Sequence, residues 1–471
     1  MRRYGQYPLG WQQFGHLGLT STFGAFTPGE GVGYVPPDGF DLYLAPSAAG
    51  ASDSNPGTQA APVRTHAGLR TLINALGAGV SKTFYAEGVE YVGQHLDLSS
   101  GTAGAGAEAD ITFGEGYILD GTGITNNAIQ CGGANGWTMI CRAENPAVRP
   151  IVRNFTNPSA NGFGLHGANT LEVHDFEVTA NEDGVSNHNT GGTLTTNNCY
   201  IHKNTRSQVV HAGGTSIHND DIIEGLGSEP GNLMTTVAAS IVTFNNATVI
   251  PAGTFGTTAP LGAFCSLAGT VAINGGTWGS IGVKSLVVSA ATNVTFNDVV
   301  VDLAFDGNNT LAFNDCAGHL TYRLRSGGGQ TFRNFDFRGP ATTRATNTFG
   351  TASTLLVDLG TLGVSKLDML DCSVTGYSAT AIGQGMDATE AAAFVAVPGF
   401  QIKNTAFFVN GTNIDADIVS ADGGTNIANN ITSDPLLSLT PGDEIGSWGY
   451  RPGSPCIGAG SGGGNIIFPT L

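Results

Sequence analysis

Two stretches of the sequence, TLEVHDFEV at residues 170–178 and TLTTNNCYI at residues 193–201, decide the fold class. They align without a gap at an offset of 23 residues, which places Leu171 over Leu194. In each stretch a short alternation of apolar and polar residues leads through a polar corner into a second short alternation, which is typical of strands. Residues 216–223 continue at nearly the same step. A repeat of this length, built from short strands, predicts a solenoid.

Later phrases keep the same pattern, at residues 241–250, 271–278, 294–301, 331–337, 366–374 and 401–409. Their spacing stretches to about 35 residues in the second half, which predicts longer loops there. Asn197 and Asn198 lie at the corner of their repeat, where stacked side-chain amides are expected to form a structural ladder. Leucine-rich repeats have a similar period, but their Leu-x-x-Leu-x-Leu signature is missing from these phrases.

The composition suits a coil of short strands and tight turns. Charged residues make up 12% of the 471 residues, against about 25% in a typical soluble protein, and 70 residues are Gly. The formal net charge of −18 and the absence of a basic run argue against nucleic-acid binding. The 41% hydrophobic residues argue against disorder of the whole chain, and no apolar run is long enough to suggest a membrane span.

The chain divides into four predicted segments. Residues 1–40 are rich in aromatics, Gly and Pro without a sustained period, so we expect an attachment arm without its own core, the alternative being a flexible leader. Residues 41–79 form an opening strand and a capping helix over 65–76, residues 80–435 the coil, and residues 436–471 a closing segment. Residues 1–30 lack the apolar run of a signal peptide, so we expect release by another route, such as release with a virus particle.

Three further phrases, together with the repeats, resemble the right-handed parallel β-helix proteins of the pectin-lyase-like superfamily. They are DLYLAPSAAGASDSNPGTQAAPVRTHAGLRTLINAL at residues 41–76, WTMICRAENPAVRPIV at residues 137–152, and SDPLLSLTPGDEIGSWGYRPGSPCIGAG at residues 433–460. The resemblance covers nearly the whole chain after residue 40. It implies an all-β, right-handed single-chain parallel β-helix with a short N-terminal capping helix and an irregular N-terminal arm.

The resemblance implies a fold shared by lyases, hydrolases, epimerases and phage tailspikes, and fold alone does not fix function. We expect a virion-associated, tailspike- or fibre-like protein that contacts surface glycans or neighbouring virion proteins, the latter through its arm. A homotrimer is an assembly that this resemblance allows. Two alternatives stay open: a polysaccharide lyase or glycoside hydrolase on the same scaffold, and a purely structural capsid decoration protein.

Histidines provide the best candidate for a ligand site. His166, His188 and His211 are separated by about one repeat each, which predicts that they stack on one face of three successive turns. Adjacent rings about 4.8 Å apart could share a sugar or an anion, and protonation near pH 6 would favour the anion. Packing outside the coil is the competing interpretation of the same column.

Carboxylates near this column are the other candidates. Glu182 and Asp183 are adjacent, and adjacent strand residues point to opposite faces, so only one of them is expected in a given groove. No catalytic motif of the family is present, and the catalytic residues stay unknown. The three histidines span two turns, too far for a zinc site, and the scattered cysteines (131, 141, 199, 265, 316, 372 and 456) are expected to be small core residues. We predict no metal site and no cofactor.

Overall fold

The computed structural model of the chain describes residues 34–432 with several gaps. The residues outside this description are 1–33, 134–135, 159, 189–190, 226–233, 237–239, 251–264, 280–285, 308–309, 325–328, 334, 339–354, 358–365, 376–379, 385–386, 409, 411 and 433–471. In the described part the chain forms 37 strands and three short helices.

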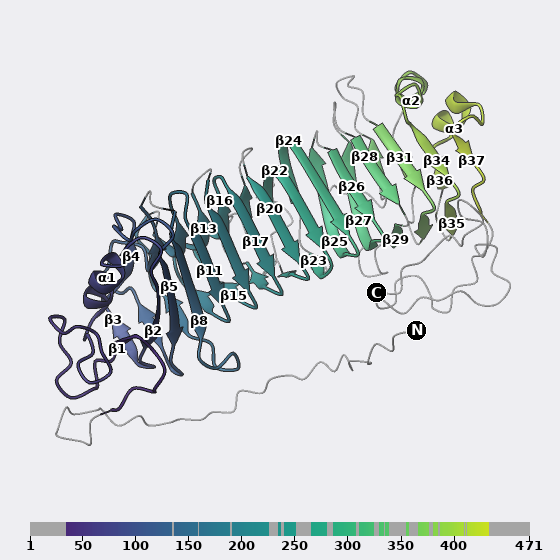
Figure 1. Ribbon diagram of the computed structural model, residues 1–471. Coiled ribbons are helices and arrows are strands. Elements are labelled where there is room, and N and C mark those ends of the chain that lie inside the picture. The colour runs from purple at the N-terminus through teal and green to yellow at the C-terminus, as the bar shows by residue number, and fades with distance from the viewer. Residues whose placement is uncertain are drawn as a thin grey trace, which may run out of the picture.

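The strands wind into one elongated right-handed coil, in which each strand pairs with its counterparts one turn earlier and one turn later (Figure 1). The pairing is parallel, and between β11 (Thr170–His174) and β14 (Thr193–Asn197) it joins Leu171 to Leu194, as the offset of the two stretches predicts. The predicted fold class, an all-β parallel β-helix, is therefore confirmed.

Three parallel sheets run the length of the coil. The first sheet contains β1 (Leu42–Leu44), β2 (Ser81–Ala86), β5 (Glu108–Phe113), β8 (Thr138–Ala143), β11, β14, β17 (Thr215–Asn219), β20 (Ile241–Asn245), β22 (Cys265–Asn274), β24 (Leu286–Asn297), β26 (Thr310–Asn314), β28 (Gly329–Arg333), β31 (Lys366–Leu370), β34 (Gln401–Lys403) and β37 (Ile427–Ala428). The second sheet contains β3 (Glu90–Val92), β6 (Ile118–Asp120), β9 (Ile151–Arg153), β12 (Glu177–Thr179), β15 (Tyr200–His202), β18 (Ile222–Glu224), β21 (Thr248–Ile250), β23 (Thr277–Gly279), β25 (Val300–Gly307), β27 (Ala317–Leu324), β29 (Asp336–Arg338), β32 (Ser373–Thr375) and β35 (Ala406–Phe408).

The third sheet carries the candidate site. Its strands are β4 (Leu96–Leu98), β7 (Ile129–Cys131), β10 (Asn161–Leu165), β13 (Asp183–Asn187), β16 (Ser207–His211), β19 (Met234–Thr236), β30 (Leu355–Val357), β33 (Thr380–Gln384) and β36 (Thr412–Ile414). Between β19 and β30, the long strands β22, β24, β25 and β27 continue from one sheet into another. The hydrogen-bonded network is therefore continuous around the coil.

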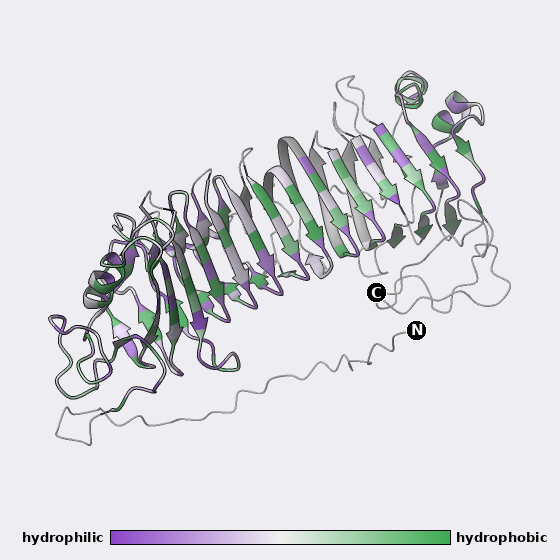
Figure 2. Cartoon of the chain, viewed as in Figure 1, coloured by the Kyte–Doolittle hydropathy of each residue, from purple (hydrophilic) through white to green (hydrophobic). Residues whose placement is uncertain are grey.

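The core fills the inside of the coil, because alternate residues of every sheet point inward. Along the first sheet, Val173 is followed in register by Thr196, His218 and Phe244 in the next three turns. Most such columns are apolar, and Figure 2 shows hydrophobic residues alternating with polar ones along the strands. The column that contains His218 is polar for two turns, which matters for the site.

Stacked asparagines fix the corner after the first sheet. Asn219 donates its side-chain amide to Asn197, and the same bond continues through later turns at 2.8 or 2.9 Å. The ladder consists of Asn197, Asn219, Asn245, Asn274, Asn297 and Asn314. The next residue adopts a left-handed backbone in most turns, as at Asn198 with φ 52°, and Asn and Asp tolerate this conformation. The structural interpretation of these asparagines is confirmed.

The ladder also measures the length of each turn. Successive amides are separated by 22, 26, 29, 23 and 17 residues. Separations of 35 and 33 residues occur near the C-terminal end, at the bonds from Arg333 to Asp368 and from Asn404 to Asp371. Turns near the N-terminal end are equally long, since Arg153 bonds to Asp120 and Asn161 to Asn127 over 33 and 34 residues. The predicted lengthening is therefore right for the last turns, but the first turns are as long, and the turns around β26 are the shortest of these.

The N-terminal end is covered as predicted. The helix α1 (His66–Asn74) lies against β1 and β4 at the beginning of the coil (Figure 1). Thr65 caps it by accepting a hydrogen bond from the Gly68 amide, and Leu69 and Ile73 are buried in the core. The predicted arm falls mostly outside the described residues. Its last part is described, and there Tyr34 donates to the Tyr85 hydroxyl at 3.1 Å.

The C-terminal end carries two helices that the sequence analysis did not anticipate, α2 (Ala388–Val395) and α3 (Ala416–Asp422). They pack against each other in the turns that connect the last strands (Figure 1). Asp387 caps α2 in a reciprocal arrangement with Glu390. The predicted closing segment, 436–471, lies outside the described residues. None of the described helices is long and apolar enough to cross a membrane.

Candidate functional site

The third sheet presents the predicted histidines at the ends of successive strands. Leu165, Asn187 and His211 pair in register as the last residues of β10, β13 and β16. His166 and His188 each follow a paired residue by one position, so they lie on the opposite, outward face. His211 is itself a paired residue and points inward. The predicted column of three therefore contains two histidines, and placing His211 in it was wrong.

A single extra residue causes this difference. Thr179 pairs with His202 and Asp183 pairs with Ser207, so the corners between these residues are counterparts in successive turns. The corner from His202 to Ser207 is one residue longer than the corner from Thr179 to Asp183. A shift of one residue moves a strand side chain to the other face of its sheet. The longer corner includes Arg206, which reaches back over the previous turn.

The outward pair consists of two partly buried rings whose centroids are 5.0 Å apart. Burial lowers the pKa of His166 below the usual histidine value, and Asp97 opposes this shift. Burial also lowers the pKa of His188; His166 lowers it further, while Asp183 raises it. Both rings are therefore neutral at pH 7, and they take up a proton at a lower pH than an exposed histidine does.

The two candidate carboxylates converge on one cation. Arg206 Nε donates to Asp183 Oδ1 at 2.9 Å, and a second guanidinium nitrogen contacts the other oxygen of Asp183. Arg206 also lies 3.9 Å from Glu182. The expectation that adjacent carboxylates point apart was wrong here, because Glu182 belongs to the corner before β13. Asp183 is completely buried and Arg206 is about half exposed, so the cation is the accessible member of the pair.

Uncharged polar groups occupy the outward face beside the histidines. Gln130, Gly164 and Ser186 pair in register, and the neighbouring Phe163 belongs to the core, so all three point outward. A side chain at Gly164 would meet the Asn161 amide nitrogen at 3.4 Å and the Ser186 hydroxyl at 3.5 Å. Glycine therefore lets these polar groups approach one another across the turns.

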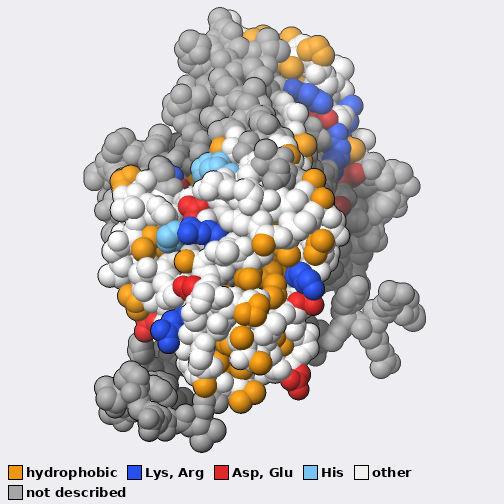
Figure 3. Space-filling model, turned by 60° about the vertical axis from the view of Figure 1, so that its left-hand side comes forward, with side chains coloured by type: hydrophobic (Ala, Val, Ile, Leu, Met, Phe, Trp, Pro, Cys, Tyr) orange, Lys and Arg blue, Asp and Glu red, His pale blue; other side chains and the backbone are white. Residues whose placement is uncertain are grey.

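One acceptor on this face is unused within the described protein. Asn161 is almost fully buried, and its Oδ1 has no hydrogen-bond partner among the described groups, although its amide nitrogen donates to Asn127 at 3.2 Å. A buried acceptor without a partner is costly and is usually satisfied by water or a ligand. Figure 3 shows that charged and histidine side chains are sparse over the described surface it presents.

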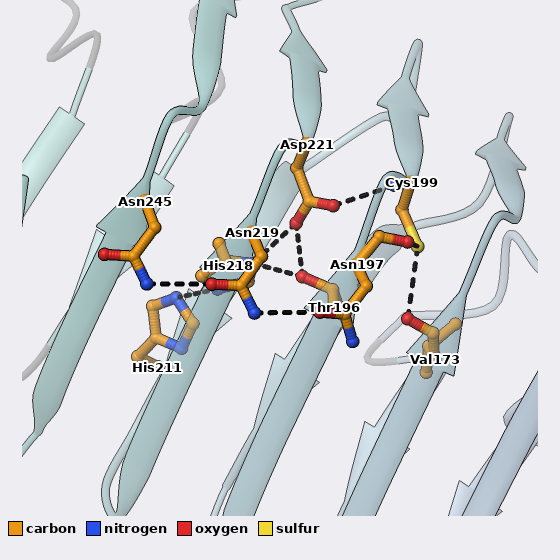
Figure 4. Close-up of polar contacts among 9 residues, drawn as sticks. All are labelled: Val173, Thr196, Asn197, Cys199, His211, His218, Asn219, Asp221 and Asn245. Atoms are coloured by element: carbon orange, nitrogen blue, oxygen red, sulfur yellow. Dashed lines mark hydrogen bonds and ion pairs between the residues drawn. The ribbon is translucent and has the colours of Figure 1, made fainter. Parts of the chain in front are cut away.

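His211 takes part in a separate, completely buried network inside the coil (Figure 4). Its Nε2 lies 3.3 Å from Nε2 of His218, which comes from β17 of the next turn. The His218 ring stacks on Phe244 with centroids 4.8 Å apart and an interplanar angle of 13°. Burial lowers the pKa of His211 well below the usual value, and His218 and His188 lower it further.

Asp221 forms the centre of this network. One carboxylate oxygen accepts the Cys199 backbone N–H at 2.8 Å, and the other accepts the Thr196 hydroxyl. His218 Nδ1 lies 3.1 Å from the second oxygen and 2.6 Å from the Thr196 hydroxyl. Figure 4 shows these groups beside the asparagine ladder. The residues come from two successive turns and are inaccessible to solvent, so this cluster cannot receive a substrate in the closed coil.

The sequence analysis did not assign an inward role to His218 and Asp221. In TSIHN at residues 215–219 the apolar residue is Ile217, which simple alternation would place inside. The structure instead pairs Asn219 with Asn197, so Ser216 and His218 point inward and Ile217 outward. Aligning the ladder asparagines, rather than the apolar residues, would have revealed this register.

Other candidate groups have a structural explanation. The five described cysteines (131, 141, 199, 316 and 372) are free and buried, as predicted for small core residues. In the described part of the chain, no group of three or more His, Cys, Asp or Glu residues has an arrangement that could hold a metal ion. Comparisons with protein-family models, with curated proteins and with solved structures found no match for this chain.

Proposed function

We propose that this chain is a virion-associated protein, resembling tailspikes or fibres of the pectin-lyase-like superfamily, which contacts glycans through the outward face of its third sheet. The observation that carries the proposal is the neutral pair of His166 and His188 beside the half-exposed Arg206. We call the surface formed by these three residues the histidine face.

The chemistry of the histidine face suits hydroxyl-rich ligands. A neutral imidazole carries one hydrogen-bond donor and one acceptor, as a sugar hydroxyl does. Arg206 adds a donor group, while Asp183 and Glu182 compensate its charge. Because two carboxylates face the single Arg206 cation and the protein carries a net charge of −18, we propose neutral rather than strongly acidic polysaccharides as ligands.

Binding is favoured over hydrolysis by the same contacts. A glycosidase needs two carboxyl groups that flank the scissile bond. In the histidine face Asp183 is completely buried and held by Arg206, so its carboxylate is not free to reach a substrate. The lyase or hydrolase alternative therefore has no support from these residues.

An immobilised array of neutral and acidic polysaccharides tests the proposal. We expect the full-length protein to bind neutral glycans, and His188→Ala to weaken this binding by about tenfold through loss of one or two hydrogen bonds. His174→Gln changes a histidine on a different sheet and serves as the matched control. Equal binding by the wild type and His188→Ala would reject the histidine face as the site, and release of sugar fragments would favour an enzyme.

Attachment to a particle is tested separately. Removing residues 1–33 leaves the contact between Tyr34 and Tyr85 in place, so the melting temperature of the body should stay nearly unchanged. The truncated chain should no longer enter the particles of its parent virus. Unchanged incorporation would show that the arm is not the attachment element, and a truncated chain that fails to fold would place the arm within the body.

A further inference from the structure

The interior of the coil is polar rather than apolar at β14, β16 and β17. Elsewhere the inward columns of the first sheet are mainly apolar, but here Thr196, Ser216 and His218 replace apolar residues and His211 faces them from the third sheet. These side chains are completely buried. The resulting polar block interrupts an apolar core that continues on both sides, with Val173 before it and Phe244 after it.

We propose that the buried network of His211, His218 and Asp221 is an acid-sensitive latch, which holds two successive turns together at neutral pH and opens them locally when it gains a proton. The proposal is independent of the glycan-binding role of the histidine face. It follows from the hydrogen-bond order of the network.

The partners of each atom determine that order. Asp221 accepts hydrogen bonds from the Cys199 amide and the Thr196 hydroxyl, so it acts as a carboxylate. His218 Nδ1, which faces both the Asp221 carboxylate and the Thr196 oxygen, must then carry its hydrogen. In a neutral ring His218 Nε2 is left as an acceptor, and it receives the N–H of His211 Nε2 at 3.3 Å.

This assignment explains the one unpaired atom of the network. His211 Nδ1 is buried and has no hydrogen-bond partner among the described groups. With the hydrogen on Nε2, Nδ1 carries only a lone pair. An unpaired buried acceptor is tolerated better than an unpaired N–H. The neutral network therefore satisfies each of its buried hydrogens.

An added proton breaks this arrangement on either histidine. On His211 Nδ1 it creates a buried N–H without an acceptor. On His218 Nε2 it brings two N–H groups together at 3.3 Å, unless His211 moves its own hydrogen to the unpaired Nδ1. Either product leaves an unsatisfied charged or polar group inside the coil, which is strongly unfavourable. Opening the two turns relieves it by exposing the rings to water.

The surrounding groups set the direction of the pH effect. The described titratable groups that face His211 are His218 and, at longer range, His188. Asp221 faces His218. Burial, His218 and His188 all lower the pKa of His211, whereas the exposed ring titrates near 6.5. The open form therefore binds more protons than the closed form as soon as the pH falls below about 6.5, and opening becomes easier with acidity.

Native-state hydrogen exchange of the full-length protein between pH 7.5 and pH 5 tests this proposal, with rates corrected for the pH dependence of intrinsic exchange. We expect protection of peptides within residues 207–224 to fall by at least about tenfold per pH unit below about 6.5, which is the slope for the proton that His211 takes up on opening. Residues 366–375 contain no histidine and pair only with strands that contain none, so they should keep their protection.

Two variants sharpen the result. His211→Gln keeps a side-chain N–H that can reach His218 but cannot titrate, so the pH slope at residues 207–224 should become shallower by the contribution of one proton. His174→Gln, which changes a partly exposed histidine of β11, should keep the wild-type slope. A wild-type slope in His211→Gln, or an equal loss of protection at residues 366–375, would overturn the proposal. If His211→Gln does not fold, the contrast between the two wild-type segments decides.

Discussion

Two histidine pairs with almost equal distances between their rings lie in neighbouring turns of this coil, one on its outside and one inside. The rings of His166 and His188 are 5.0 Å apart, and those of His211 and His218 are 5.1 Å apart. The first pair is partly exposed beside Arg206, whereas the second is completely buried with Asp221. The comparison teaches that in a solenoid the chemistry of a histidine depends on its register rather than on its repeat spacing.

The register itself depends on small features of the corners. The corner before β16 is one residue longer than its counterpart, and this turns His211 inward while placing Arg206 over Asp183. In the first sheet the amide bond from Asn219 to Asn197 keeps His218 inward against the local apolar pattern. Both pairs are thus consequences of corner residues, and the predictions below test that comparison.

The largest effect is expected at the centre of the buried pair. Asp221→Ala removes the acceptor of the Cys199 amide, the Thr196 hydroxyl and His218 Nδ1 at once. Leaving buried donors without a partner should lower the free energy of unfolding by about 3–5 kcal/mol. Denaturant unfolding at pH 7.5 measures this loss.

The outward side supplies the matched control for Asp221→Ala. Glu172→Ala removes a partly exposed carboxylate whose contact with His174 is 3.4 Å long, so it should change stability by less than about 0.5 kcal/mol. A loss of similar size in both variants would contradict the distinction between a buried and an exposed histidine environment.

The inverted register of β17 gives the next largest contrast. Ile223 is buried in the core, and Ile223→Ala should cost about 2–5 kcal/mol. Ile217 points outward between Thr195 and Thr243, so Ile217→Ala should cost less than about 1 kcal/mol. The same unfolding experiment compares the two variants. A large loss at Ile217 would mean that β17 is turned the other way and that His218 faces solvent.

The fold could be predicted from the sequence because the repeat from Leu171 to Leu194 brings apolar residues and corner asparagines into alignment together. Both signals agree there, and they predicted the coil and the ladder, whereas the capping helix was predicted from the helical spacing of apolar residues after Thr65. At Ile217 the two signals disagree, and hydrogen bonds of the ladder decide the outcome. No pattern of hydrophobicity marks the extra corner residue that turns His211 inward, so three-dimensional pairing was needed to separate it from His166 and His188.

The ladder residue that fixes this register should have a moderate effect. Asn219→Ala removes two amide bonds, one to Asn197 and one from Asn245, both 2.8 Å long. We expect a loss of about 1–3 kcal/mol in the free energy of unfolding. Asn219→Gln retains the amide on a longer side chain and should recover only part of this loss. Full stability in Asn219→Ala would show that the apolar residues, and not the ladder, determine the register.

The smallest effect concerns the outward pair and is a shift of pKa without a change of fold. Because His166 lowers the pKa of His188, replacing it with an uncharged residue should raise the pKa of His188 toward the usual histidine value. NMR titration of histidine-labelled wild type and His166→Gln measures this shift directly. Burial, which is the larger cause, is unchanged by the replacement, so the pKa should stay below 6.5. His174→Gln provides the control, since its ring contacts Glu172 and does not act on His188. An unchanged pKa of His188 in His166→Gln would mean that the two rings do not interact electrostatically. His166 and His188 would then not act as a pair in the histidine face, and the conclusions about the buried pair would be unaffected.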